Sequence, residues 1–140
     1  MCKYRPAEHR RQRSGAAAAE LALALPFLTV MFAVAVDYCR IFYVTQTIQN
    51  CAWVAAMYAS GTANNPDAAS AAAAAQQAAV AEGSSLNPPL DASQVTVSYQ
   101  GGNAVVTVQY QFTAVTPLIG DRGTVTLTRT LTMGMAPTGP

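Results

Sequence analysis

The first residues whose types and spacing could carry chemistry are Gly15, Ala16 and Glu20. Gly15 stands before four alanines, and a glycine followed by small side chains presents no bulk to a peptidase that must draw extended backbone into its active site. Cleavage after Gly15 would expose an α-amino group on Ala16, four residues before Glu20 and positively charged at neutral pH. We therefore predict a processing site at these three residues, with the chain as substrate and not as catalyst.

Glu20 is the only charge in a long apolar stretch. Leu21–Val36 contains 16 uncharged residues, and Ala16–Ala19 extend it to the roughly 20 residues that cross a hydrocarbon core. An ionised carboxylate inside a membrane helix costs roughly 2.5 to 3.5 kcal/mol, so Glu20 needs a partner or an interfacial position. We predict that Glu20 pairs with the Ala16 amino group of a neighbouring subunit. The alternative is that Glu20 reaches the lipid headgroups.

Charge is distributed unevenly along the chain. The first 15 residues hold five basic residues and one acidic residue, whereas the remaining 125 hold three basic and six acidic residues. Basic residues before a membrane segment keep that end in the cytoplasm, which places the acidic remainder outside. The basic cluster has no aromatic platform, zinc spacing or recognition helix beside it, so we predict no nucleic-acid partner.

The chain divides into a basic leader (1–15), a long helix (16–60), a linker with an Ala-rich helix (61–94) and a β meander (95–140). From Glu20 to Ser60 the helix would reach about 60 Å, so it must project beyond the membrane. Pro26 removes one backbone hydrogen bond within the span and predicts a local kink or melted turn. Asn65-Pro66-Asp67 is a start signal for the Ala-rich helix, which we expect to lie on the surface.

The second half of the long helix has two faces with different compositions. One face carries an apolar stripe at helical spacing, which we predict to pack on the chain's own sheet: Ile41, Val44, Ile48, Ala52, Ala55 and Ala59. We predict that the opposite face, which includes Gln46, Asn50, Trp53 and Met57, meets a partner. A wide core within the single domain is the alternative.

Cys39 and Cys51 are too far apart on one helix to form a disulfide with each other. We expect both to be buried apolar residues, with an intermolecular disulfide as the alternative.

Three alternating runs predict a one-sided antiparallel sheet. The apolar faces are formed by three groups of residues: Val95, Val97 and Tyr99; Val106, Val108, Tyr110 and Phe112; Val125, Leu127, Leu131 and Met133. Gly101-Gly102-Asn103 predicts a hairpin turn, and Thr116–Gly123 a loop. Arg129 stands on the apolar face, where its stem can extend along the sheet edge. Because three strands need a cover, the sheet should pack on the helix stripe.

The segment RSGAAAAELALALPF followed by VDYCRIFYVTQTIQNCAWVAAMYA resembles the TadE-like pseudopilins of tight-adherence (Flp, type IVc) pilus systems. The matching features are the spacing of Gly15 and Glu20, Leu25-Pro26, Asp37 and Arg40 after the apolar tract, and Tyr43, Gln46, Asn50, Ala52 and Tyr58 beyond it. The expected fold class is α+β and pilin-like, with a long N-terminal membrane-spanning helix, a small antiparallel sheet on its C-terminal half and a short Ala-rich helix.

The resemblance implies a minor pseudopilin, processed by a prepilin peptidase, that spans the bacterial inner membrane once and takes part in pilus assembly. Its implied partners are membrane lipid, the peptidase, other pilins or pseudopilins and the inner-membrane assembly platform. Two other classes stay open: an uncleaved anchor that presents a binding module, and a secreted β domain whose signal peptide is cut near Ala33 and Ala35. We expect no enzyme, no cofactor and no metal, because the only histidine is His9 in the leader and no nucleophile has a recognisable base.

Overall fold

The computed structural model describes residues 9–61, 68–116 and 123–135, with backbone only for residues 9–14 and 68. Two α-helices come first, α1 (His9–Ser60) and α2 (Ala68–Glu82), and two short 3-10 helices follow, η1 (Gly83–Ser85) and η2 (Ala92–Gln94). The strands are β1 (Val95–Gln100), β2 (Asn103–Thr113) and β3 (Thr124–Gly134). The predicted α+β fold class, with a long N-terminal apolar helix, a short helix and an antiparallel sheet, is confirmed.

Helix α1 is unbroken over 52 residues, which corresponds to about 78 Å. It begins at His9, within the segment predicted as a leader, because residues 9–14 contain no glycine or proline to stop a helix. It also continues through Pro26, so of the two predicted outcomes the melted turn is wrong, because one missing hydrogen bond does not interrupt so long a helix. The kink stays a prediction. The Gly61 amide donates to the Met57 carbonyl (3.1 Å) where the helix ends.

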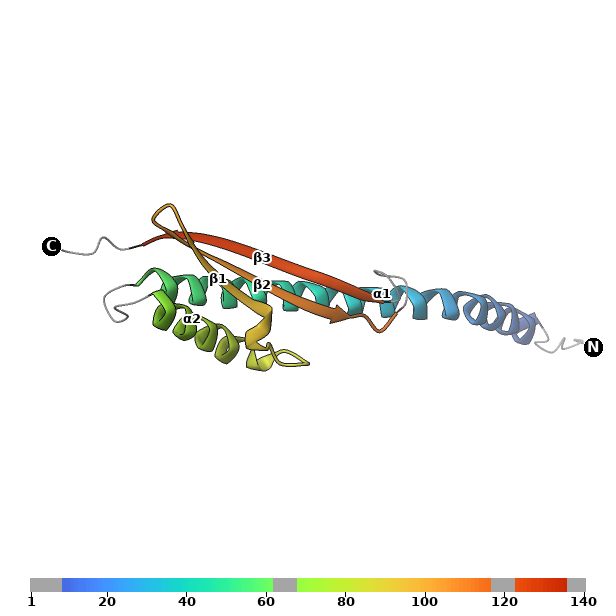
Figure 1. Cartoon of the computed structure of the whole chain (residues 1–140). Helices are drawn as coiled ribbons and strands as arrows, with labels where there is room; N and C mark the ends of the chain where they lie inside the picture. Colours follow the sequence, from blue (N-terminus) through green and yellow to red (C-terminus); the bar gives the residue numbers. More distant parts are fainter. Residues whose placement is uncertain (1–8, 62–67, 117–122, 136–140) are drawn as a thin grey trace, which may run out of the picture.

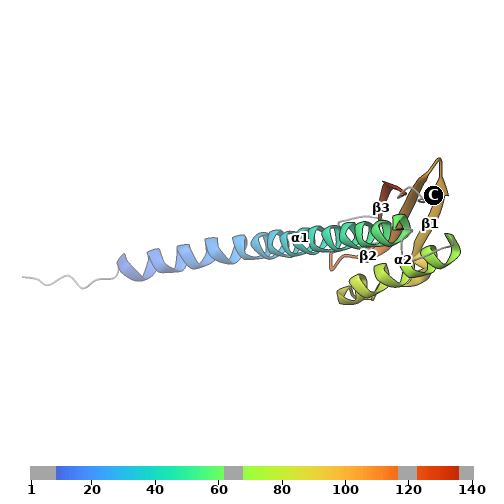
Figure 2. The ribbon, with the colours of Figure 1, turned by 90° about the vertical axis from the view of Figure 1, so that its left-hand side faces the viewer.

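Burial divides α1 at Asp37. Almost every side chain from residue 15 to residue 36 is exposed, including Leu23 (81% exposed) and Phe32 (71%). From Asp37 to Ser60, one side of the helix is buried under the rest of the chain. Figure 1 shows the N-terminal part of α1 projecting alone, while β2 and β3 run alongside its C-terminal part. The view turned by 90° shows the same division (Figure 2).

The strands form one antiparallel sheet in the order β1-β2-β3. Pairing places Val97 opposite Val106 and Val108 opposite Arg129, so the alternating apolar residues of all three strands share one face. The hairpin turn consists of Gly101 and Gly102 alone, with φ of 58° and 77°, as a two-residue type I′ turn requires. Asn103 was predicted in this turn, but it begins β2 and pairs with Gln100.

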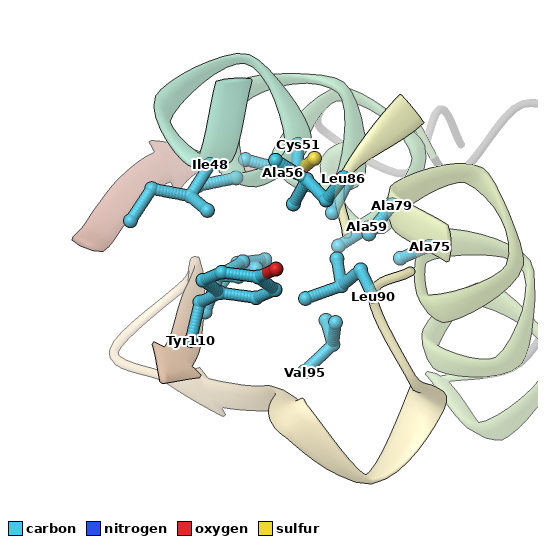
Figure 3. Close-up of a cluster of buried hydrophobic side chains, with 14 of the residues drawn as sticks. Ile48, Cys51, Ala56, Ala59, Ala75, Ala79, Leu86, Leu90, Val95 and Tyr110 are labelled. Carbon is cyan, nitrogen blue, oxygen red and sulfur yellow. The ribbon is translucent and has the colours of Figure 1, made fainter. Parts of the chain in front are cut away.

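The hydrophobic core lies between α1, α2 and the inner face of the sheet. Figure 3 shows Ile48, Cys51, Ala56 and Ala59 from α1 meeting Tyr110 and Val95 from the sheet, with Ala75 and Ala79 of α2 and the loop residues Leu86 and Leu90 closing one side. The Tyr110 hydroxyl donates to the Pro88 carbonyl (2.8 Å). Burial raises the pKa of the Tyr110 phenol, so this donor keeps its proton.

Helix α2 is a surface helix whose buried side consists of small residues. Ala71, Ala75 and Ala79 repeat every four residues and pack against α1. Gly83 ends the helix with its Cα against Leu90: an added Cβ would lie 2.5 Å from the Leu90 Cβ, so only glycine fits. The predicted start signal Asn65-Pro66-Asp67, residues 1–8 of the predicted leader and residues 117–122 of the predicted loop lie outside the described residues.

Candidate functional site

The predicted processing residues lie on the part of α1 that is exposed among the described residues. Gly15, Ala16 and Glu20 are all exposed, and a Cβ added at Gly15 would meet no atom within 4 Å. Ala16 and Glu20 are one helical turn apart, so their backbones lie on the same face. Because Gly15 is helical, a peptidase that needs extended backbone must first unwind this turn. Glycine lowers the cost of that unwinding.

The two predicted faces of the C-terminal half of α1 occupy different environments. Val44, Ile48, Ala52, Ala55 and Ala59 are buried, and Ile41 packs against the same core. The residues predicted to face a partner are all exposed: Gln46, Asn50, Trp53 and Met57. Glu20 and Gln46 are 26 residues apart, or about 39 Å along the axis, so the processing residues and the partner face form two separate sites.

Asp37 marks the point where α1 leaves its exposed segment and meets the folded domain. Its side chain is fully buried and accepts three hydrogen bonds from the chain that follows β2. The Val115 amide donates to Oδ1 (2.8 Å), and the Thr116 amide and hydroxyl donate to Oδ2 (2.7 Å each). We call this arrangement, Asp37 with Val115 and Thr116, the Asp37 clamp. It ties the end of β2 to α1 beside the apolar tract.

Arg40 supports the clamp from the next turn of the helix. Its Nη1 lies 3.5 Å from Asp37 Oδ1, and its guanidinium lies 5.1 Å from the centroid of the Phe112 ring. A cation over an aromatic face and beside a carboxylate is favourable on both counts. A buried carboxylate with several donors stays ionised, because hydrogen bonds to the charged form offset the loss of water. Asp37 is therefore a fixed charge held by the folded domain.

A second polar contact joins α1 to the segment after α2. The Tyr43 hydroxyl donates to Ser85 Oγ (3.4 Å) of η1. This bond is long and exposed, so it adds little to the buried contacts around it.

Among the described residues, no cluster of histidine, cysteine, aspartate or glutamate could hold a metal ion.

These features agree with a comparison against known protein families. Residues 15–57 match the TadE-like protein family. The resemblance inferred from the sequence is confirmed for this segment, which contains Gly15, Glu20 and Asp37. No curated protein and no solved structure matches the chain. The TadE-like segment ends shortly before the end of α1, so α2 and the sheet lie beyond it.

The Asp37 clamp was not among the sites predicted from the sequence. In the sequence, Asp37 and Arg40 belong to the TadE-like pattern, and an acidic residue directly after an apolar tract is itself a signal that a partner is needed. The cysteine prediction is correct for Cys51, which is buried, and wrong for Cys39, which is exposed. Cys39 follows the clamp on the side of α1 that the sheet does not cover.

Proposed function

We propose that this chain is a minor pseudopilin that takes part in assembly of a tight-adherence (type IVc) pilus. The observation that carries the proposal is the division of α1 at Asp37. Residues 15–36 form an exposed apolar helix long and apolar enough to cross a membrane, and the same helix continues without a break into the core of a folded domain. The TadE-like match over residues 15–57 supports the pilus assignment.

In this proposal, the chain spans the bacterial inner membrane once. The basic leader stays in the cytoplasm and the sheet lies outside, as the charge distribution favours. A prepilin peptidase cleaves after Gly15 and leaves Ala16 as the new N-terminus. Glu20 then lies one turn from a positive amino group, and across a subunit contact that amino group offsets the cost of its charge in the membrane.

The exposed side of α1 is the proposed contact with other subunits. Gln46, Asn50, Trp53 and Met57 combine amides that can bond across an interface with large apolar side chains, a composition typical of interface centres. Other pilins or pseudopilins and the inner-membrane assembly platform are the proposed partners. Membrane lipid surrounds residues 16–36.

The decisive experiment is intact-mass measurement with N-terminal sequencing of the chain recovered from cells that carry a prepilin peptidase. A chain that begins at Ala16 is expected. A chain that begins near Val36 would identify a secreted domain with an ordinary signal peptide. An intact leader in cells with active peptidase would favour the uncleaved anchor that presents a binding module, and would contradict the processing step.

Glu20 can be tested separately. Replacing Glu20 with Leu should leave cleavage intact and reduce copurification with the other pilins. Leu23→Ala is the matched control, because Leu23 lies on the same exposed apolar segment and carries no charge. Unchanged copurification of a cleaved Glu20→Leu chain would eliminate the pairing role.

A further inference from the structure

Strand β3 is an edge of the sheet and is much less protected than the opposite edge. The opposite edge, β1, has six residues and lies against α2, where Gln76 Nε2 donates to the Val95 carbonyl (3.0 Å). β3 has 11 residues, and its pairing with β2 runs without interruption from Thr124 to Gly134. Among the described elements, none pairs with the outer side of β3.

The register identifies which backbone groups of β3 are open. Two backbone hydrogen bonds lie at the ends of the β2–β3 ladder: Ala114 N to Gly123 O (2.7 Å) and Met135 N to Gly102 O (3.0 Å). Both involve odd-numbered residues on the β3 side, so the odd-numbered residues of β3 are the ones that bond to β2. In an antiparallel pair, the residues between those bonded positions direct their N–H and C=O groups away from the partner. The open groups therefore belong to the even-numbered threonines: Thr124, Thr126, Thr128, Thr130 and Thr132.

The side chains along β3 also leave room for another strand. Leu127, Leu131 and Met133 pack against the core but are only partly buried, and Val125, opposite Phe112, is also only partly buried. Ser60 Oγ lies 3.1 Å from Met133 Sδ, which places that side of α1 next to β3. Trp53, seven residues before Ser60 and so on the same side, is 51% exposed. Trp53 is thus an exposed apolar side chain on the side of α1 that lies next to β3.

Soluble domains usually protect such edges with lysine, proline or a bulge. β3 has none of these, and its only charge is Arg129, near its middle and on the inner face. Arg129 Nη1 donates to the Thr128 carbonyl (3.2 Å), one of the open edge acceptors. The only salt bridge among the described residues joins Asp37 and Arg40, so no described carboxylate neutralises Arg129. A strand that pairs here must displace this guanidinium, and a carboxylate on that strand would accept it.

We propose that β3 is a strand-addition site for an extended segment of a partner protein. Main-chain bonds to the even-numbered threonines would supply affinity. The segment would place apolar side chains over Leu127, Leu131 and Trp53, and one carboxylate against Arg129. Arg129 therefore acts as a selector: it disfavours strands that lack an acidic residue on the inner face and favours those that have one.

A second copy of this chain fits the edge less well. β3 runs along α1 (Figure 1), so antiparallel pairing of the β3 edges of two copies would point their anchors in opposite directions. In the proposed function, two anchors that enter one membrane from the same side cannot adopt that arrangement. Parallel pairing of the two edges would place the inner faces of the two copies on opposite sides of the joined sheet, so neither copy would cover the apolar inner face of the other. We therefore assign the edge to a segment of a different protein.

The test uses the full chain in detergent and a synthetic peptide of roughly nine residues, the length of a long strand, in which threonines alternate with valine and leucine and one inner position is glutamate. Residue-resolved amide exchange by NMR should show slower exchange at Thr126, Thr128, Thr130 and Thr132 by at least about tenfold at saturating peptide. A peptide with lysine in place of glutamate should bind at least about tenfold more weakly. Arg129→Glu should reverse that preference.

Two variants of Thr128 isolate the main chain. Thr128→Pro removes an N–H that does not bond to β2, so the fold should persist while peptide affinity falls at least about tenfold. Thr128→Val keeps the N–H and should retain binding. Circular dichroism checks that each variant is folded.

Several outcomes would overturn the proposal. They are even-numbered amides already protected in the monomeric chain without peptide, equal affinity for the glutamate and lysine peptides, or equal binding by the two Thr128 variants. If protection of the even-numbered amides without peptide increased with the concentration of the chain, the edge would be assigned to a second copy instead. All these readouts use the purified chain, so they are independent of pilus production and of the processing experiment.

Discussion

Asp37 shows how one side chain can join a long apolar helix, of the kind that fits a membrane anchor, to a folded domain. Its carboxylate is buried at the first turn beyond the apolar tract, and both of its oxygens accept hydrogen bonds from Val115 and Thr116, far away in sequence. Two of the three donors are backbone amides, which cannot rotate away. Residue 37 must therefore present two atoms that both accept hydrogen bonds. A carboxylate, with its two oxygens, meets this requirement.

Replacing Asp37 with Asn should open the clamp. One of the two amide positions of asparagine is a donor, and it would face a backbone N–H that needs an acceptor. The amides of Val115 and Thr116 should then exchange with solvent at least about tenfold faster. Thr116→Val is the matched control: it removes the hydroxyl bond but keeps both amide bonds, so a smaller increase is expected. Unchanged exchange in the Asn variant would contradict the role given to the clamp.

Two tyrosines on the inner face of the sheet form a natural pair for comparison. The Tyr110 hydroxyl donates to Pro88, whereas the Tyr99 hydroxyl is buried and has no hydrogen-bond partner among the described residues. Tyr110→Phe should lower the free energy of unfolding by about 1 kcal/mol. Tyr99→Phe should leave it unchanged or raise it, because it removes a buried polar group without a partner. Denaturant unfolding followed by circular dichroism measures both.

The same tyrosines predict how stability depends on alkaline pH. Burial raises the pKa of Tyr99 and of Tyr110 above the ordinary value of 10.0, so the unfolded chain loses these protons first as pH rises. Their contribution to stability is fully present below about pH 10 and is lost as pH rises through the higher pKa of the folded state. The double variant Tyr99→Phe with Tyr110→Phe should show a shallower fall in unfolding midpoint above pH 10. An identical fall in both proteins would contradict the assignment.

At the scale of elements, Gly83 at the end of α2 lies very close to Leu90. Gly83→Ala would force a Cβ to 2.5 Å from the Leu90 Cβ, which requires the segment after α2 to shift. The expected cost in unfolding free energy is about 1 to 3 kcal/mol. Gly134→Ala is the control, since its Cβ would meet only Asn103 Oδ1 at 3.7 Å, an ordinary contact. Equal stability of the two variants would show that the segment yields easily.

The elements themselves could be predicted because their signals are local. Alternating apolar residues predicted the strands, paired glycines predicted the turn, and the stripe from Ile41 to Ala59 predicted which side of α1 the sheet covers. The Asp37 clamp could not be predicted in this way. Val115 and Thr116 are 78 and 79 residues from Asp37, in irregular chain that has no periodicity to reveal its position.

The sequence pattern also does not predict which single positions on the helix are exposed. Cys39 is a small apolar residue of a type usually buried, yet it lies on a side of α1 that neither the sheet nor α2 reaches. Helix α1 also includes residues 9–14 of the predicted leader, because charged residues do not stop a helix. A helical conformation does not decide whether a segment is removed, so the leader stays a prediction.

For the whole molecule, the predicted orientation can be tested through Cys39. It is exposed directly beyond the apolar tract, on the side predicted to lie outside the membrane, whereas Cys51 is buried. A membrane-impermeant maleimide added to intact spheroplasts should label the chain at Cys39. Cys39→Ser should abolish the labelling. Labelling of Cys39 only after the membrane is permeabilised would reverse the orientation.

The unbroken course of α1 has a mechanical consequence. The strands β2 and β3 run along the helix, and the Asp37 clamp joins them to it at the end nearest the apolar tract. A pull on the apolar end, directed along the axis, would load the contacts between helix and sheet in shear, so that many must yield together. The same force applied across the axis would peel them apart one after another. The contacts between α1 and the sheet should therefore resist tension along the helix axis better than tension across it.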